Sequence, residues 1–199
     1  VDNGLEGDGD YRAARDMLRR RTPRVIGHVD GEPLRREDET AGDAAKRLVK
    51  ELDHTCLAIQ GPPGSGKTWI GGRMILELVL EGKSVGVTAN SHKVIGNLLY
   101  QAWTAQTEYH EFSERELRIG QKPSGKKEPA CEHASKVKDA GEVPVAFAER
   151  SLDVIGGTSW LWASAKIPPQ TVDVLFIDEA GQFSLANALV ASAVAKSVV

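Results

Sequence analysis

Eight consecutive residues in the first half of the chain have the types and spacing needed to hold phosphate groups. They are Gly61, Pro62, Pro63, Gly64, Ser65, Gly66, Lys67 and Thr68, which read GPPGSGKT. Glycines let the backbone fold tightly around an anion, and the amides of residues 64–68 can then point at it. Lys67 can reach the β- and γ-phosphates of a nucleotide, and the hydroxyl of Thr68 can bind Mg²⁺. The pattern is that of a phosphate-binding P-loop, and the alternative is a glycine-rich turn without a ligand.

Two adjacent acidic residues follow an apolar run much later in the chain, in the segment VDVLFIDEA. A carboxylate at the end of a buried strand is costly to desolvate unless a cation meets it. We therefore expect Asp178 to hold the Mg²⁺ that Thr68 also contacts, and Glu179 to orient and deprotonate an attacking water. The alternative for this acidic pair is a helix N-terminus at which negative charge offsets the helix dipole.

The two motifs can meet only if the elements that carry them lie at one edge of a sheet. Short apolar runs predict strands at 56–60, 85–88, 152–156 and 172–177. Helical spacing predicts helices at 11–21, 39–52, 67–81, 93–106, 159–165 and 184–196. Alternating strands and helices favour an α/β fold with a parallel sheet covered by helices on both faces. Ligands of such sheets bind at the carboxyl ends of the strands, where Asp178 follows its strand.

The chain divides into a charged N-terminal segment, residues 1–40, and one domain, residues 41–199. The composition changes at about 107–150, where glycines, prolines and basic residues accumulate, so we interpret this stretch as an insertion in the domain. Acidic residues are interleaved with the basic ones, which favours a solvated mixed-charge loop over a contact with a phosphate backbone. The acidic start and the apolar KSVV at the end lead us to expect a fragment of a longer protein.

The composition is that of a globular protein, with 41% hydrophobic and 27% charged residues. No apolar run approaches the roughly 20 residues of a membrane helix, and the acidic, glycine-rich start does not resemble a signal peptide. The two cysteines, Cys56 and Cys131, suit a reducing compartment, so we expect a cytoplasmic protein with no membrane partner. The formal charge of -3 gives no overall attraction to nucleic acid, which would need a local basic surface.

Four segments, in the same order, resemble motifs of superfamily 1 helicases of the Upf-like group, which includes senataxin. IQGPPGSGKT resembles motif I, SVGVTANSHKVIGNLL motif Ia, DVIGGTSWLWA motif Ic and IDEAGQ motif II. The TANSHK and NLL segments look closest to bacterial members that carry a RecB-like nuclease module. The resemblance covers residues 57–184 and implies a RecA-like P-loop NTPase domain, the first of two such domains in a helicase. It also implies ATP and Mg²⁺ as cofactors.

The resemblance also implies contacts with a single-stranded nucleic acid, with DNA favoured over RNA. By this resemblance, Ser91, His92 and Lys93 of motif Ia and Thr158 of motif Ic contact the strand's backbone. Hydroxyl groups and a lysine can donate to phosphate oxygens. Gln182 takes the last position of the DExxQ pattern, which helps to link the nucleotide to neighbouring motifs. The alternatives are a polar helix start at 91–93 and an ordinary polar residue at 182.

Two tryptophans, Trp160 and Trp162, lie close to the segment that resembles motif Ic. An indole ring can stack on a nucleic-acid base or pack in a core. We expect both rings to pack against the sheet, with base stacking as the alternative.

The chain departs from the family pattern in three respects. The segment ETAGDAAKRLVKEL holds no glutamine of the kind that reads adenine upstream of motif I. His92 and Gly96 stand where many relatives have Asn and Asp. Motifs III–VI are absent, and with them the second domain's arginines, which in related systems raise rates by roughly 10³ to 10⁵. We therefore expect this chain to bind nucleotide, to hydrolyse it poorly and to unwind nothing by itself.

Two other functions remain open from the sequence. A P-loop would also suit a small nucleotide or metabolite kinase, although such kinases usually begin close to the loop and need no adjacent Asp-Glu pair. The chain could also be a non-catalytic module in which a bound nucleotide changes affinity for another molecule. Stimulation of ATP hydrolysis by single strands would distinguish the helicase from both.

Overall fold

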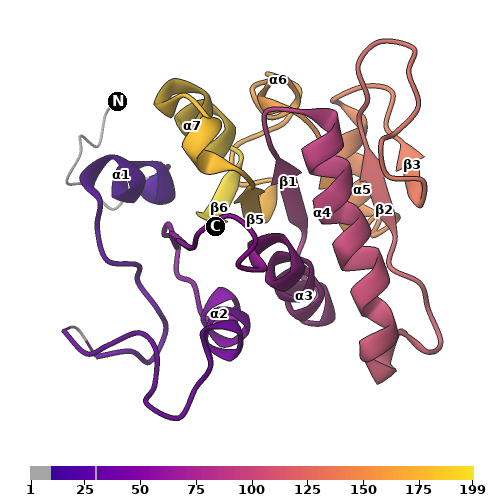
Figure 1. Cartoon of the computed structure of the whole chain (residues 1–199). Coiled ribbons are helices and arrows are strands. Elements are labelled where there is room, and N and C mark those ends of the chain that lie inside the picture. The colour runs from indigo at the N-terminus through magenta and orange to yellow at the C-terminus, as the bar shows by residue number, and fades with distance from the viewer. Residues whose placement is uncertain (1–9, 30) are drawn as a thin grey trace.

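A parallel sheet runs through the molecule in the strand order β3-β2-β4-β1-β5-β6 (Figure 1). The computed structural model describes residues 10–29 and 31–199. Its strands are β1 (Val85–Thr88), β2 (Ile119–Gln121), β3 (Ala134–Lys136), β4 (Val154–Gly156), β5 (Val172–Ile177) and β6 (Ala195–Val198). Each neighbouring pair is parallel, so all six strands have their carboxyl ends at the same edge.

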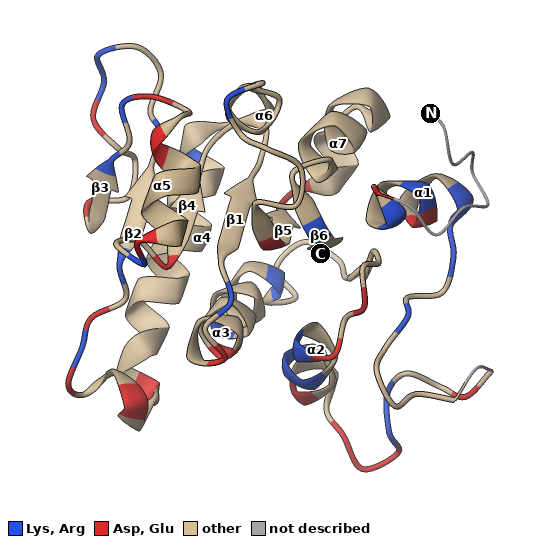
Figure 2. Ribbon diagram, turned by 180° about the vertical axis from the view of Figure 1, so that it is seen from behind, with Lys and Arg blue, Asp and Glu red and all other residues tan. Residues whose placement is uncertain are grey.

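Helices cover both faces of the sheet (Figures 1 and 2). One face carries α2 (Ala41–Lys50), α3 (Lys67–Leu80) and α4 (His92–Ala105). The other carries α1 (Arg12–Arg19), α5 (Glu142–Ala148), α6 (Ser159–Trp162) and α7 (Leu185–Ser192). Successive strand side chains point to opposite faces, so Phe176 packs with the first group of helices and Leu175 with the second. The predicted α/β class, with a parallel sheet between two helical layers, is confirmed.

Three of the helices are capped at their N-terminus by a hydroxyl side chain. Thr40, Ser91 and Ser184 precede α2, α4 and α7, and each side-chain oxygen accepts a hydrogen bond from the amide three residues later. Such caps satisfy amides that have no partner inside the helix, which fixes where each helix starts. Within the described residues, no helix is both long enough and apolar enough to span a membrane.

Two predicted elements beside β6 differ from the structure, and the helix expected at 159–165 is shorter, ending at Trp162. The segment 56–60 was expected to be a strand, but only Cys56 forms a bridge, with Val198, and the Leu57 amide donates to the Val198 carbonyl over 2.8 Å. The helix expected to reach Lys196 ends at Ser192, because the residues from Ala195 onward pair with β5 instead. Short apolar runs do not distinguish a helix end from a strand without knowledge of the pairing partner.

The stretch 107–150, expected to be an insertion with loop character, contributes to the central sheet. It contains two short 3₁₀ helices (Gln106–Glu108 and His110–Phe112) and supplies β2, β3 and α5, with β2 pairing directly with β4. The buried Gln121 amide donates to the His92 carbonyl over 3.1 Å and accepts from the Cys131 amide over 2.9 Å. This stretch is therefore part of the core. Its surface still carries charged side chains, such as Glu128, which pairs with Lys136 of β3 over 2.8 Å.

The described part of the N-terminal segment packs on the edge of the sheet. Asp16 of α1 is buried, accepts from the Thr55 hydroxyl over 2.8 Å and pairs with Arg24 over 2.8 Å. The first nine residues of the predicted 1–40 segment, and residue 30, lie outside the described residues. Residues 10–29 are thus anchored to the domain by the hydrogen bond from Thr55 to Asp16 and by one from the Arg24 side chain to the Asp53 carbonyl over 3.2 Å.

Helices α3 and α4 touch at Gly72, and this contact leads to a prediction about stability. A Cβ atom at Gly72 would lie 2.7 Å from the Gln101 carbonyl carbon and 2.8 Å from the Ala102 amide nitrogen. Because these are backbone atoms, the helices would have to separate, and we expect Gly72→Ala to lower the free energy of unfolding by about 1–3 kcal/mol. Urea unfolding followed by circular dichroism measures the change.

The matched control is Gly71→Ala, one residue earlier on the same helix. There the new Cβ would meet only the end of the Leu98 side chain, at 3.1 Å, which can rotate away. Alanine also favours a helix over glycine by about 1 kcal/mol, so this variant should be close to neutral. Equal losses in both variants would contradict the proposed backbone contact.

Candidate functional site

The glycine-rich loop joins the segment beside β6 to the first turn of α3. Gly64 and Gly66 have φ angles of 78° and 83°, in the left-handed region that residues with a side chain rarely adopt. Helix α3 differs from α2, α4 and α7 because the residue before it is Gly66, which has no side chain to cap it. Among the described residues, no side chain accepts a capping hydrogen bond from the first turn of α3. The first-turn amides of α3 therefore face outward with the positive end of the helix dipole, which is the usual form of a phosphate site.

Lys67, the first residue of α3, closes the loop on itself. Its ammonium donates to the Gly61 carbonyl over 2.7 Å and to the Pro62 carbonyl over 3.1 Å. Within residues 10–29 and 31–199, Lys67 forms no ion pair with a carboxylate. Its positive charge is held by neutral oxygens alone and can be attracted by an anion in the loop.

The acidic pair follows β5 at the edge where the loop lies. The Asp178 amide donates to the Thr88 carbonyl over 2.9 Å, which fixes the end of β5 against the end of β1. Burial raises the pKa of Asp178 above its ordinary value and the charge of Glu179 adds to this, whereas Lys67 and Thr68 oppose the rise. The two motifs that we expected to meet, more than a hundred residues apart in the sequence, are therefore neighbours.

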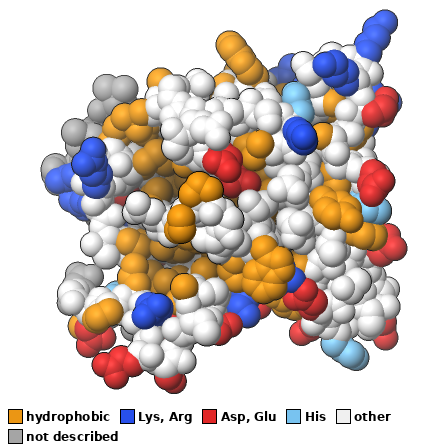
Figure 3. Space-filling view, in the orientation of Figure 1, with side chains coloured by type: hydrophobic (Ala, Val, Ile, Leu, Met, Phe, Trp, Pro, Cys, Tyr) orange, Lys and Arg blue, Asp and Glu red, His pale blue; other side chains and the backbone are white. Residues whose placement is uncertain are grey.

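One cavity of about 690 Å³ has both motifs in its wall. Gly61, Pro63 and Lys67 line it from the loop side, and Asp178 and Glu179 line it from the end of β5. Hydrophobic side chains gather in the hollow between α2 and α7 in Figure 3, where acidic side chains lie at its edge. The apolar part of the wall is formed by Met17, Leu57, Ile59, Met74, Leu98, Phe176, Phe183 and Val198.

Two buried oxygens at the carboxyl edge of the sheet have no hydrogen-bond partner among the described residues. They are Thr88 Oγ1 at the end of β1 and Asp178 Oδ2 just after β5, whereas Asp178 Oδ1 accepts from the Glu179 amide over 2.9 Å. Leaving a buried polar atom unpaired costs about 1–3 kcal/mol, so such atoms usually have a ligand, an ion or water as partner. Unpaired oxygens at the ends of two adjacent strands make this edge a candidate ligand site.

The oxygen donors fit Mg²⁺ better than a metal that needs nitrogen or sulfur ligands. Mg²⁺ is usually held by one or two carboxylates together with substrate phosphates and water, and Asp178 and Thr68 offer a carboxylate and a hydroxyl. In the described ranges no three or more His, Cys, Asp or Glu side chains group into a site of their own. A magnesium ion here would therefore depend on the phosphates of a bound nucleotide for its remaining ligands.

Glu179 precedes the short 3₁₀ helix η3 (Ala180–Gln182), and Gln182 is its last residue. Glu179 is exposed, with a left-handed backbone at φ 53°, and accepts a hydrogen bond from the Gln182 side chain over 3.3 Å. The Asn90 side chain donates to the Gln182 carbonyl, which ties this turn to the loop after β1. A non-glycine residue in this conformation is uncommon and tends to occur at functional sites.

The four residues expected to contact nucleic acid follow the carboxyl ends of β1 and β4. Ser91 caps α4 by accepting from the Val94 amide over 3.2 Å, Lys93 is exposed, and Thr158 precedes α6. His92 is half-buried, and burial lowers its pKa, an effect to which Lys127 and then Lys122 add. This lowering of the pKa favours the neutral form of His92, which makes it a poor source of positive charge for a phosphate group.

Several residues at this edge were not predicted as part of the site. Lys122 follows β2 and lies with Lys127 close to His92, so both bring positive charge to the edge that carries Ser91. Recognising β2 as a strand of the central sheet would have placed Lys122 there. Thr88 and Asn90 were also missed, although Thr88 ends an apolar run just as Asp178 follows one.

The two tryptophans near Thr158 have different environments. Trp162 is buried, and its indole nitrogen donates to the carbonyls of Gly157 over 3.1 Å and Val87 over 3.3 Å. The prediction that it packs against the sheet is confirmed. The same prediction for Trp160 is wrong, because this side chain is 85% exposed. Two residues apart on a helix means about 200° of rotation, so the two rings leave α6 on opposite sides.

No protein-family model matches the chain, and no curated protein matches it.

The environment of Asp178 leads to a prediction about stability and pH. Burial raises the pKa of Asp178 in the folded protein above its value in the unfolded chain. Ionisation of this carboxyl therefore lowers the stability of the fold as the pH rises from the unfolded to the folded pKa. We expect Asp178→Asn to raise the free energy of unfolding of the ligand-free protein at neutral pH. The gain should disappear below the ordinary carboxyl value of 3.8, where the folded and unfolded states are both protonated. Denaturant unfolding at several pH values measures it.

Asp173→Asn is the control with the opposite sign. Burial alone would raise the pKa of Asp173, but hydrogen bonds from Lys196 and Ser84 hold it below its ordinary value. This carboxylate therefore stabilises the fold above its unfolded pKa, and the stabilisation is lost as the pH falls. Asp173→Asn should lower stability at neutral pH, and equal losses in both variants would contradict the description of Asp178.

Proposed function

We propose that the chain is the ATP-binding and ATP-hydrolysing domain of a superfamily 1 helicase of the Upf-like, senataxin-like group, with a RecA-like P-loop fold. Such a domain couples hydrolysis to movement along a single-stranded nucleic acid. One observation carries the proposal: Lys67 and Thr68 lie beside Asp178, and one cavity is lined by both Lys67 and Asp178. The all-parallel sheet is compatible with the proposed fold.

The loop would bind the phosphates of ATP through the outward-facing amides of α3 and the side chain of Lys67. This lysine would exchange the neutral carbonyls of Gly61 and Pro62 for phosphate oxygens, which form stronger charge-assisted hydrogen bonds. Gly64 and Gly66 have no side chain that could block the approaching anion, and glycine tolerates the positive φ angles that this loop requires. Binding therefore needs a redirected side chain and little change in the backbone.

Thr68 and Asp178 would hold Mg²⁺ together with the phosphates. When bound, the ion neutralises charge on the β- and γ-phosphate groups. The ion would be a partner for Oδ2 of Asp178, which is otherwise unpaired. This supports the assignment of Asp178 as the metal ligand. Glu179 would orient a water molecule and accept its proton, and the hydrogen bond from Gln182 would hold the carboxylate in position.

The single strand would lie along the carboxyl ends of β2, β4 and β1. Ser91, Lys93 and Thr158 would contact its phosphates, and Lys122 and Lys127 extend the positive charge of this edge. Phosphate contacts of this kind make binding weaker as salt increases and give little sequence preference. We propose single-stranded DNA before RNA, a second RecA-like domain as the partner that completes the ATP site, and a nuclease domain in the parent protein.

The role of Lys67 leads to a prediction about nucleotide binding. We expect Lys67→Ala to weaken the binding of ATP with Mg²⁺ by at least about tenfold, because a charge-assisted contact with phosphate is lost. Isothermal titration calorimetry measures this loss. Lys93→Ala removes a lysine outside the loop and should leave ATP affinity unchanged. Unchanged affinity in Lys67→Ala, or no binding by the folded wild-type protein, would refute the proposed nucleotide site.

The role of Glu179 leads to a prediction about turnover. In a protein that also contains the proposed second domain, Glu179→Gln should keep ATP binding and lose roughly 10²- to 10⁴-fold in hydrolysis, as expected when a general base is removed. A coupled phosphate-release assay with and without single-stranded DNA measures this. Glu149→Gln, an exposed acid at the end of α5, is the control that should retain activity. Transfer of phosphate to a small acceptor without any effect of DNA would indicate a kinase instead.

A further inference from the structure

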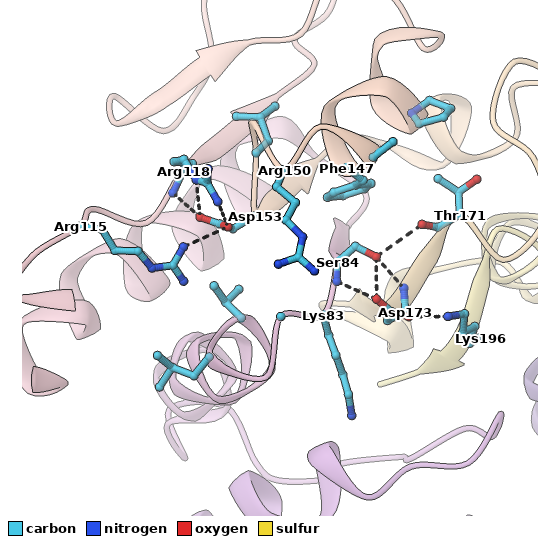
Figure 4. Close-up of a pocket in the computed structure, with 16 residues that line it drawn as sticks. Lys83, Ser84, Arg115, Arg118, Phe147, Arg150, Asp153, Thr171, Asp173 and Lys196 are labelled. Carbon is cyan, nitrogen blue, oxygen red and sulfur yellow. Dashed lines mark hydrogen bonds and ion pairs between the residues drawn. The ribbon is translucent and has the colours of Figure 1, made fainter. Parts of the chain in front are cut away.

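A second cavity, of about 610 Å³, lies at the opposite edge of the sheet (Figure 4). Its wall includes Ser84, Asp153 and Thr171, which directly precede β1, β4 and β5. The amino ends of these strands therefore form its base, whereas the proposed nucleotide site uses their carboxyl ends. The loop after α3, the end of α5 and Lys196 of β6 complete the wall.

The side chains that reach this cavity carry more positive than negative charge. Two acids contribute, Asp153 and Asp173, and four cations surround them: Arg115, Arg118, Arg150 and Lys196. A fifth basic residue in the wall, Lys83, directs its ammonium away, to the Lys50 carbonyl over 2.7 Å and to Glu81 over 3.0 Å. Four cations against two carboxylates leave an excess of two positive charges.

Both acids are already occupied by protein groups. Asp153 accepts from the Arg118 side chain over 2.6 Å and 3.1 Å, and also lies 3.5 Å from Arg115. Asp173 accepts from Lys196 over 2.7 Å and from the Ser84 amide over 2.8 Å. Burial alone would raise the pKa of each, but these contacts hold it below the ordinary value, so both acids stay ionised. Neither is free to neutralise the remaining cation.

That remaining cation is Arg150. Its guanidinium lies in the middle of the cavity in Figure 4, between the groups around Asp153 and those around Asp173. Across the described ranges it forms no ion pair and no side-chain hydrogen bond. An arginine fork that points into a cavity without a partner suits a planar or tetrahedral anion, which it can bind through two hydrogen bonds.

The backbone at Arg150 is unusual for an arginine. Its φ is 53°, in the left-handed region, at the end of α5, where the Ser151 amide donates back to the Ala146 carbonyl over 2.9 Å. Glycine is the usual residue at this position of a helix end, and Gly82 occupies the same position after α3 with φ 74°. The protein thus accepts strain at Arg150, and the structure gains a guanidinium in the cavity.

An apolar surface adjoins the charged groups. Phe147, Pro144 and Leu152 line one side of the cavity, next to Arg150. We propose that this cavity binds a phosphate monoester on a small apolar or aromatic body, with the phosphate at Arg150 and the body against Phe147. A phosphate monoester carries about two negative charges at neutral pH, which matches the excess charge of the wall. The proposal does not depend on the proposed helicase function.

Phenyl phosphate is the probe, and ¹⁵N-labelled protein without Mg²⁺ is titrated with it while amide chemical shifts are recorded. We expect shifts at Lys83, Ser84 and Arg150, a weaker effect of inorganic phosphate on the same amides, and no effect of phenol. Shifts confined to residues 61–68 would place the ligand in the glycine-rich loop and overturn the proposal. If inorganic phosphate binds as tightly as phenyl phosphate, the proposed contact of an apolar body with Phe147 is wrong. If phenol binds as tightly, the proposed contact of the phosphate with Arg150 is wrong.

Arg150→Gly is the decisive variant, because glycine suits the left-handed backbone and the fold should be retained. It should weaken phenyl phosphate binding by at least about tenfold. Arg20→Gly is the matched control: Arg20 is an exposed arginine with φ 52° at the end of α1 and does not line the cavity. Arg20→Gly should bind like the wild type. Equal affinity of Arg150→Gly and the wild type would refute the proposal.

Discussion

Parallel pairing of the strands is the constraint on which both cavities depend. Every strand enters at one edge and leaves at the other, so all residues that follow strands gather at one side of the molecule. Asp178, Asn90 and Thr158 follow three different strands and become neighbours for this reason alone. The glycine-rich loop joins them because Cys56 bridges to Val198 of β6, which itself pairs with β5. An antiparallel β5 would place Asp178 at the opposite edge, away from the loop.

The two edges attract anions by different physical means. At the carboxyl edge α3 begins, and its amides and helix dipole provide positive potential in addition to that of Lys67. At the amino edge α3 and α5 end, so the dipoles there are negative and attraction must come from side chains. Arg118, Arg150 and Lys196 meet this requirement. The backbone therefore dominates one candidate site and arginine chemistry dominates the other.

The sequence predicted the elements whose patterns are local and missed those whose identity depends on distant partners. Strands β1 and β5 were predicted at their observed bounds, because each is a short, mostly apolar segment between clear turns. Strand β2 has only three residues, and its Gln121 is polar; only the His92 carbonyl and the Cys131 amide, both remote in sequence, make it suitable for burial. The closeness of the loop and Asp178 was predicted because Asp178 follows a strand, at the edge where parallel sheets bind their ligands. The cavity around Arg150 was not, because no spacing rule reveals a left-handed arginine.

The close approach of α3 and α4 at Gly72 has a mechanical consequence. At Gly72 the backbones of the two helices approach closely, with no side chain between them. No side chain at this point can change its rotamer to accommodate a shift of one helix against the other. The start of α3 carries the glycine-rich loop, and the start of α4 carries Ser91 and Lys93. The spacing of the two helices is therefore fixed at this point, and with it the position of the loop's helix relative to the helix that begins at Ser91.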